Sequence, residues 1–142
     1  MYLDTSVVLS LYVTDAFTPK AENFCRGHAE MLTVSAWVDL EVRSALSFLV
    51  RTERLSLAGA QTALGAYDAD RRRGVYRNVW LNAEHFAAGG QVLALGNPLR
   101  AGDALHLGAV LVEKLPLVTS DKMLHKVAEE TRIGCTYLPG EP

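Results

Sequence analysis

Several features are scarce in this sequence, and each scarcity excludes a class of protein. Cysteine occurs only at Cys25 and Cys135, with no CxxC pair, which argues against a disulfide scaffold or a zinc site. No apolar run approaches the roughly 20 residues of a membrane-spanning helix, so we expect no membrane association. The N-terminus lacks the basic start and cleavage signature of a signal peptide, and Asp4 interrupts its apolar run. We therefore expect a cytoplasmic protein.

The chain also lacks a surplus of positive charge. It has 14 Lys and Arg against 16 Asp and Glu, a formal net charge of −2, whereas nucleic-acid-binding proteins are usually basic. Four acids, discussed below, are candidate metal ligands, and setting them aside leaves 12 acidic against 14 basic residues. Bound divalent ions would neutralise the four acids themselves. The charge balance is therefore compatible with an anionic substrate but does not argue for one.

Short apolar segments alternate with helical patterns along the chain, without a repeat, a low-complexity tract or a linker. We predict strands over residues 1–4, 31–35, 76–80, 117–119 and 135–138. We predict helices over residues 6–12, 19–27 (with Thr18 as N-cap), 36–51, 57–74 (with Ser56 as N-cap), 83–95 (with Asn82 as N-cap), 102–111 and 122–131. This alternation is typical of a parallel sheet covered on both faces. The prediction is an α/β fold, one domain over residues 1–142, with a central parallel sheet of four or five short strands flanked by helices.

Two carboxylates follow predicted strands and precede predicted helices. Asp4 ends the run Met1-Tyr2-Leu3, and Asp121 follows Leu117-Val118-Thr119-Ser120. Open α/β sheets bind ligands at the carboxyl edge of their strands, where the two acids meet if their strands are neighbours. An Asp at the start of a helix also caps it, and this structural role competes with the functional one for each Asp taken alone.

Two further acids lie in predicted helices that are largely apolar. Glu41 falls on the same helical face as the apolar stripe that begins at Val38, and a buried carboxylate is costly unless it is paired or bound to metal. The alternative is a Glu that reaches solvent or pairs with Arg43 or a distant basic residue. Asp103 opens a helix whose only other polar side chain is His106, and its alternative role is again helix capping.

The four acids together predict a site for Mg²⁺ or Mn²⁺. Hard cations prefer carboxylate oxygens, and clustered carboxylates without a cation repel one another. Two such metals about 3.5–4 Å apart can activate water and stabilise the leaving oxygen in phosphodiester hydrolysis. One alternative is a phosphohydrolase with an aspartyl nucleophile, although those enzymes usually need a second Asp where this chain has Ser6. Another is a non-catalytic regulator or RNA-binding module in which the acids only cap helices.

Four segments of the sequence resemble the four motifs of PIN-domain ribonucleases, and in particular those of VapC-type toxins from type II toxin–antitoxin systems. They occur in the family's order and at similar spacing over nearly the whole chain. The segments are Tyr2-Leu3-Asp4-Thr5-Ser6-Val7-Val8, Asp39-Leu40-Glu41-Val42-Arg43-Ser44-Ala45-Leu46, Leu99-Arg100-Ala101-Gly102-Asp103-Ala104-Leu105-His106-Leu107 and Val118-Thr119-Ser120-Asp121-Lys122-Met123-Leu124.

The resemblance implies a Mg²⁺- or Mn²⁺-dependent endoribonuclease. Asp4 and Asp103 match its central metal ligands, and Glu41 and Asp121 match acids that complete the site directly or through water. Other residues of the same motifs are expected to hold a metal-bound water, to order the carboxylates or to contact an RNA phosphate. These are Thr5, Ser6 and Ser120 for the first two roles and Arg100 for the last. The resemblance also implies an RNA substrate, a cognate antitoxin that inserts a peptide near the active site, and a toxin homodimer.

Three other groups of residues have two interpretations each. The basic patch, defined as Arg71–Arg73 and Arg77 together with Tyr76, could contact RNA, but a solvated helix end is favoured. His106 lies one helical turn from Asp103 and could bond it or reach substrate, although a core histidine is favoured. Aromatic side chains are expected in the core or at a subunit contact; these are Trp37, Trp80 and Phe86.

Overall fold

The structure is a computed structural model that describes residues 1–28 and 31–140. Within these residues, five strands alternate with helices along the chain. The strands are β1 (Tyr2–Leu3), β2 (Leu32–Ser35), β3 (Tyr76–Val79), β4 (Leu117–Thr119) and β5 (Cys135–Tyr137). The helices are α1 (Thr5–Ser10), α2 (Thr18–Gly27), α3 (Ala36–Arg51), α4 (Leu57–Arg73), α5 (Ala83–Leu93), α6 (Ala101–Glu113) and α7 (Lys122–Glu130). Residues 29–30 and 141–142 of the predicted domain lie outside the described residues.

The strands form one sheet in the order β3-β2-β1-β4-β5, and every pair of neighbours is parallel. The first strand lies in the middle, with Tyr2 opposite Thr33 of β2 on one side and Leu117 of β4 on the other. The chain adds strands outward on one side of β1 and then returns to the other side. This reversal makes the carboxyl edge between β1 and β4 the topological switch point, where α/β sheets bind ligands.

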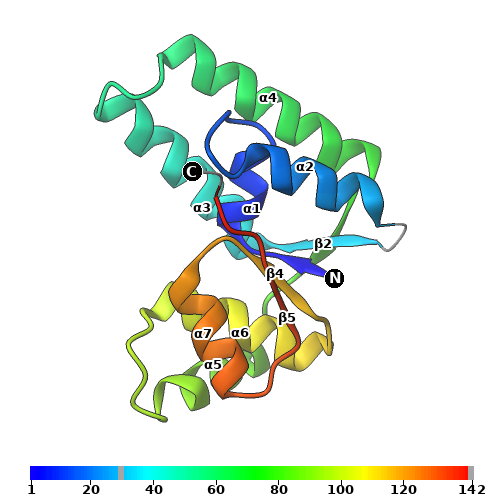
Figure 1. Cartoon of the computed structure of the whole chain (residues 1–142), viewed down its shortest axis with the longest axis vertical. Helices are drawn as coiled ribbons and strands as arrows, with labels where there is room; N and C mark the ends of the chain where they lie inside the picture. The colour runs from blue at the N-terminus through cyan, green and yellow to red at the C-terminus, as the bar shows by residue number, and fades with distance from the viewer. Residues whose placement is uncertain (29–30, 141–142) are drawn as a thin grey trace.

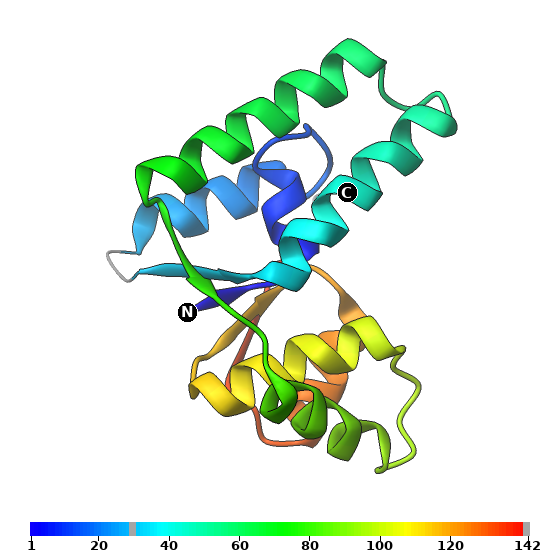
Figure 2. The ribbon, with the colours of Figure 1, turned by 180° about the vertical axis from the view of Figure 1, so that it is seen from behind.

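The helices cover both faces of the sheet, as the alternation of elements predicts. Helices α1 to α4 lie on one side of the strands and α5 to α7 on the other (Figures 1 and 2). Tyr2 and Leu3 of the central strand are 0% exposed, and apolar residues from both helical layers pack around them. The predicted α/β class and parallel sheet are therefore confirmed, and each predicted element is present with ends that differ by two residues at most.

The start of α2 differs from the prediction. Phe17, rather than Thr18, is the N-cap residue, and it makes no side-chain cap. The Asp15 carboxylate accepts hydrogen bonds from the backbone amides of Phe17 and Thr18 instead. Asp15 can do so because it lies in the preceding turn, where a short carboxylate reaches the free amides of the helix.

Helix α6, which carries Asp103, is fixed by unusually close packing against α5. A Cβ atom on Gly108 would lie 2.3 Å from the carbonyl oxygen of His85 and 2.7 Å from the amide nitrogen of Gly89. Only glycine permits this approach of two backbones. The contact holds α6 along the sheet, so that its N-terminus lies at the edge where the site is predicted.

Two of the three aromatic residues do not pack in the core. Trp80 is 76% exposed and Phe86 is 59% exposed, whereas Trp37 is partly buried. Of the two predicted places, the core is therefore excluded for Trp80 and Phe86, and a subunit contact stays a prediction. None of the described helices is long and apolar enough to cross a membrane.

Candidate active site at the carboxyl edge of the sheet

Asp4 lies at the centre of the edge, directly after β1. Its side chain is 3% exposed and caps α1, where Oδ1 accepts hydrogen bonds from the Val7 amide at 3.1 Å and from the Ser6 hydroxyl at 2.6 Å. Its second oxygen, Oδ2, accepts from the hydroxyl of Thr119 at the end of β4. Every bond comes from an amide or a hydroxyl. The carboxylate is therefore held in place by neutral donors from α1 and from the end of β4.

Asp121 is joined to Asp4 through Thr119. The Thr119 hydroxyl, which donates to Asp4, accepts a hydrogen bond from the Asp121 amide at 2.9 Å. Asp121 caps α7 with one oxygen, Oδ1, which accepts from the amides of Met123 and Leu124 at 2.7 and 2.9 Å. The Ser6 hydroxyl also accepts from the Ser120 amide at 2.9 Å. The switch point thus brings the loops after β1 and β4 into direct contact.

Glu41 approaches the same edge from α3. Its Oε2 accepts hydrogen bonds from the Thr5 hydroxyl and from Nε2 of His106, the latter at 2.8 Å. Arg43, the partner considered from the sequence, pairs instead with Asp39 and Asp68 at 3.2 and 2.7 Å. The pairing with Arg43 is therefore wrong. Because Arg43 lies two residues along the helix, it points away from the face that Glu41 occupies.

Asp103 reaches the edge from the first turn of α6. Its Oδ2 accepts a hydrogen bond from the Arg100 amide at 3.2 Å, so it helps to cap its own helix. The preceding residue, Gly102, lies against Glu41: a Cβ atom there would be 3.1 Å from Oε1 of that carboxylate. Hydrogen bonds through Thr119 therefore join Asp121 to Asp4, and Thr5, the residue after Asp4, bonds Glu41, which lies beside the start of α6.

Hydrogen bonding within the described residues leaves one oxygen unused in three of these four carboxylates. Oδ2 of Asp121, Oδ1 of Asp103 and Oε1 of Glu41 accept no hydrogen bond from the described part of the chain. The hydroxyl of Ser120 is buried and also has no partner among these residues. Helix capping and ligand binding are therefore compatible. Over residues 1–28 and 31–140, however, no three Asp, Glu, His or Cys side chains are gathered closely enough to hold a metal ion by themselves.

Buried Asp4 and partly buried Glu41 have pKa values displaced in opposite directions. Burial raises the pKa of Asp4, and neither nearby His106 nor the hydrogen bonds from Ser6 and Thr119 cancel that effect. Burial also acts to raise the pKa of Glu41, but the hydrogen bonds from His106 and from the Thr5 hydroxyl outweigh it and lower the pKa. A cation bound beside Asp4 would counter the effect of burial on its pKa.

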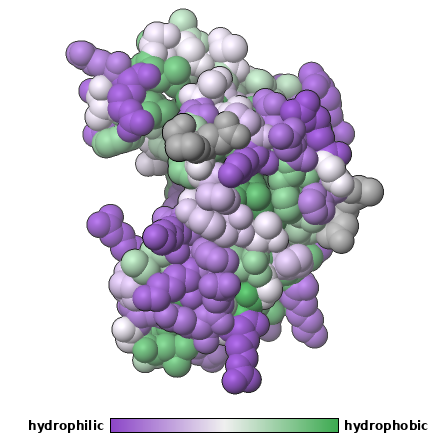
Figure 3. All heavy atoms as spheres, in the orientation of Figure 1, coloured by the Kyte–Doolittle hydropathy of each residue, from purple (hydrophilic) through white to green (hydrophobic). Residues whose placement is uncertain are grey.

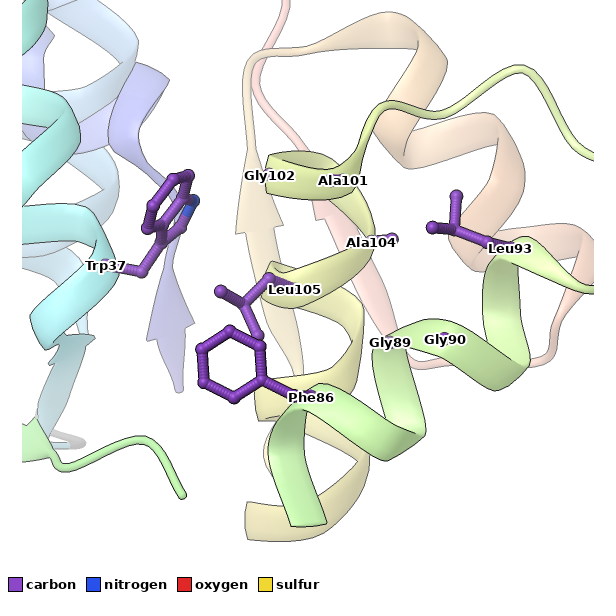
Figure 4. Close-up of a pocket in the computed structure, with 9 residues that line it drawn as sticks. All are labelled: Trp37, Phe86, Gly89, Gly90, Leu93, Ala101, Gly102, Ala104 and Leu105. Atoms are coloured by element: carbon purple, nitrogen blue, oxygen red, sulfur yellow. The ribbon is translucent and has the colours of Figure 1, made fainter. Parts of the chain in front are cut away.

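Two hollows flank the acids. One, with a volume of about 240 Å³, lies between α3, α5 and α6 and is lined by Trp37, Phe86 and Leu105 with the small residues around Gly102. Trp37 projects from α3 towards the start of α6 across this space (Figure 4). The other, of about 370 Å³, runs along α3 past Thr5, Glu41 and Arg51. The surface view shows the molecule indented on the left, between the half that carries α3 and α4 and the half that carries α5 to α7 (Figure 3).

The basic patch has a different character from the acidic site. Arg71 pairs with Asp39 at 2.7 Å, Arg73 with Asp70 at 3.2 Å, and Arg77 with Glu113 at 2.6 Å. Tyr76 is 4% exposed and its hydroxyl bonds that of Tyr12, so this member of the patch is not accessible to RNA. The patch is a helix end whose cations are mostly paired with neighbouring acids.

Sequence reasoning missed two side chains that hold the acids. Thr119 bridges Asp4 and Asp121. The feature that could have indicated it is a hydroxyl residue at the end of a predicted strand, within a segment that resembles a PIN-domain motif. His106 is a buried core histidine at 3% exposure, as favoured from the sequence, but its imidazole bonds Glu41 rather than Asp103. Only the packing of α3 against α6 could reveal that pairing. Arg100, the predicted phosphate contact, is exposed beside Asp103.

An acidic edge on a five-stranded parallel α/β sheet is an arrangement that several families share, and comparison with known proteins identifies the one concerned. A family model described as PIN domain matches residues 1–130. The chain belongs to the PIN domain family. None of the curated protein sequences matches this chain.

Solved structures with the same fold include proteins from toxin–antitoxin systems. FitAcB from Neisseria gonorrhoeae aligns with a TM-score of 0.70 at 14% identity, covering 94% of each chain. VapC20 from Mycobacterium tuberculosis, described as a sarcin–ricin loop cleaving toxin, aligns at 0.64 and 18% identity over 84% of this chain and 86% of its own. VapBC2 from Rickettsia felis, bound to a DNA fragment from its promoter, aligns at 0.64 and 16% identity over 96% of each chain. At these identities the likeness concerns the fold.

Proposed function

We propose that this chain is a Mg²⁺- or Mn²⁺-dependent endoribonuclease, the toxin of a toxin–antitoxin pair. The observation that supports the proposal is that Asp121 is joined to Asp4 through Thr119 at the switch point of a PIN domain sheet, while Glu41 and the start of α6, which carries Asp103, adjoin each other beside it. A solved structure with the same fold, described as a sarcin–ricin loop cleaving toxin, supports it. Hydrolysis of RNA phosphodiester bonds is the reaction that such a set of acids serves.

The donor set fits a hard divalent cation. All four side chains offer carboxylate oxygens, and the unpartnered Ser120 hydroxyl adds a further oxygen without a ligand of its own. Mg²⁺ usually binds through one or two carboxylates and keeps several waters, so direct contact with three acids is not required. Asp4 and Asp103 would be the central ligands, with Glu41 and Asp121 acting directly or through water. A bound ion would lower the pKa of a water and stabilise charge on the phosphate.

The remaining residues of the site would prepare it for that ion. Thr5 and Ser6 hold Glu41 and Asp4, which fixes the spacing of two acids before a cation arrives. Arg100, exposed at the start of α6, would contact a phosphate of the RNA beside Asp103. Preorganised oxygens need little rearrangement when substrate binds. This preorganisation is usually the largest contribution to catalysis in such sites.

Cleavage of RNA by the purified chain tests the proposal directly. We expect cleavage in Mg²⁺ or Mn²⁺, none in EDTA, and loss of at least about 1,000-fold in rate for Asp103→Asn. Asp68→Asn is the matched control, because Asp68 pairs with Arg43 on α3 and touches none of the four acids. Full activity of Asp103→Asn in EDTA would overturn the assignment.

We also propose an antitoxin partner and a homodimer for the chain. The hollow along α3 exposes apolar Phe48 and cationic Arg51 beside Glu41, a suitable groove for an inhibitory peptide. Trp80 and Phe86 are large exposed aromatic side chains of the kind that subunit contacts bury. Light scattering of the purified chain checks the dimer, and Trp80→Ser with Phe86→Ser should shift it to monomer.

A second candidate is a PIN domain module without catalysis. It is favoured by the observation that Asp4, Asp103 and Asp121 each use an oxygen to cap a helix. Calorimetry separates the two functions, because capping needs no ion. Absence of heat with Mn²⁺ at millimolar concentration would favour the module, whereas saturable binding that Asp4→Asn removes would favour the nuclease.

A further inference from the structure

A buried chain of hydrogen bonds runs from the middle of the sheet to one of the acids. The Ser35 hydroxyl lies 2.8 Å from the hydroxyl of Tyr2, which lies 2.9 Å from Nδ1 of His106. Nε2 of the same imidazole lies 2.8 Å from Oε2 of Glu41. Ser35, Tyr2 and His106 are 0%, 0% and 3% exposed, so water does not compete for these bonds.

The chain has one direction that satisfies every group. The Val38 amide donates to Ser35 Oγ at 3.3 Å. If Ser35 then donates to Tyr2 and Tyr2 to Nδ1, the neutral imidazole keeps its proton on Nε2 and donates it to Glu41. Each donor and each acceptor is used once. A fully satisfied buried network of this kind is rigid, because any rotation leaves a group unpaired.

We infer that His106 is a positioning residue that orients the Glu41 carboxylate, and that Tyr2 and Ser35 fix the imidazole in turn; the inference rests on the proposed metal site. The imidazole and the Thr5 hydroxyl both bond Oε2, so they define the plane and the rotation of the carboxylate. Oε1 is thereby turned towards Gly102, beside Asp103. The relay thus presents one oxygen of Glu41 to the site and holds the other.

The surroundings of Oε1 agree with this role. A Cβ atom on Gly102 would lie 3.1 Å from Oε1 and 3.1 Å from the Trp37 ring, so glycine leaves the oxygen its space. The Trp37 indole nitrogen is buried and has no hydrogen-bond partner among the described residues. It lies 3.4 Å from the same Cβ position, close to Glu41. A side chain at position 102 would therefore displace the oxygen that the relay aligns.

Partners that orient metal-binding side chains typically change metal affinity 10- to 100-fold when they are removed. We expect His106→Ala to weaken Mn²⁺ binding by about that factor, and Tyr2→Phe, two bonds from Glu41, by roughly 3- to 10-fold. His106→Gln restores a donor for Glu41 and should recover most of the affinity. A role in packing alone predicts no such rescue, since Gln does not refill the ring's volume.

The experiment measures Mn²⁺ binding by the intact chain, with the free-ion electron paramagnetic resonance signal as readout. Tyr12→Phe is the matched control: it also removes a hydroxyl with two hydrogen bonds, but its partners are Asp70 and Tyr76, neither of which bonds one of the four acids. We expect its affinity to stay within about 2-fold of the wild type. In cleavage assays, kcat at subsaturating Mn²⁺ should fall in the relay variants while KM for RNA stays unchanged.

Wild-type Mn²⁺ affinity in both His106→Ala and Tyr2→Phe would overturn the relay and leave the proposed nuclease standing. If the wild type itself bound no Mn²⁺, both inferences would fail. Should His106→Ala not fold, Tyr2→Phe still decides, because it removes a single oxygen atom and keeps the ring. Equal losses in Tyr2→Phe and Tyr12→Phe would assign the effect to general destabilisation and likewise reject the relay.

Discussion

The acidic site and the basic patch are both candidate functional sites in the sequence, but the fold pairs their charges differently. Each Asp or Glu of the acidic site receives hydrogen bonds from amides, hydroxyls or one imidazole, and within the described residues no Lys or Arg pairs with any of them. In the basic patch, Arg71, Arg73 and Arg77 each pair with a carboxylate. Uncompensated charge held by neutral donors therefore indicates a ligand site, whereas charge matched by its neighbours serves structure.

The largest difference is expected in activity. Asp4→Asn should reduce RNA cleavage by at least about 1,000-fold, because it removes a central oxygen ligand and its charge. Arg73→Gln, which neutralises an exposed and already paired residue of the patch, should change the rate less than 2-fold. Initial rates on one RNA substrate, together with growth inhibition on expression, check both. Similar losses in the two variants would remove the distinction between the clusters.

Removing a negative charge should change the free energy of unfolding in opposite directions at the acidic site and near the basic patch. Burial raises the pKa of Asp4 in the folded chain, so its stabilising effect is present below the unfolded pKa of about 3.9 and is lost as the pH rises through the folded value. At pH 7 without metal, the wild type holds a buried charge. We expect Asp4→Asn to raise the free energy of unfolding by about 1 to 3 kcal/mol.

The corresponding change near the basic patch should destabilise. Asp39 bridges Arg43 and Arg71, and Asp39→Asn should lower the free energy of unfolding by about 1 kcal/mol. Urea denaturation in EDTA at pH 5 and pH 8 measures both variants. The gain from Asp4→Asn should be larger at pH 8; a gain that shrinks with rising pH would contradict the proposed cause.

Metal should stabilise the folded protein only when the acidic site is intact. An ion that binds the folded chain alone stabilises it by about 2.7 kcal/mol at 100 times its Kd. We expect Mn²⁺ to raise the melting temperature of the wild type and of Arg73→Gln equally, but not that of Asp4→Asn. Differential scanning fluorimetry with and without EDTA checks this. An equal rise in all three would place the ion elsewhere on the chain.

The smallest expected effect concerns Arg100, the exposed cation beside Asp103. Arg100→Gln should raise KM for RNA by about 3- to 10-fold with little change in kcat, because a phosphate contact supports binding more than chemistry. The loss should shrink at higher salt, since such contacts release counterions. Arg73→Gln serves as the control with the same change in charge. A fall in kcat alone would argue against the assigned role of Arg100.

Local signals in the sequence were enough for the secondary structure. Ser56 and Gly74 mark the two ends of α4, with Ser56 Oγ accepting from Gly59 and Gly74 in the left-handed region, because caps depend on residues a few positions apart. The start of α2 was less accessible, since Asp15 caps it from outside the helix. Exposure of Trp80 and Phe86 could not be read either, because aromatic character alone does not tell a core position from a surface one.

The sequence by itself determined the α/β alternation, the four acids in motif order and the helix-starting position of three of them. Only the tertiary structure decided that Thr119 joins Asp4 to Asp121 and that His106 bonds Glu41. It also decided that Asp39 pairs with Arg71 and Glu113 with Arg77 of the basic patch. The physical reason is range. Caps and periodicity act between residues within a few positions, whereas hydrogen bonds between side chains 65 and 115 positions apart depend on strand order and helix packing.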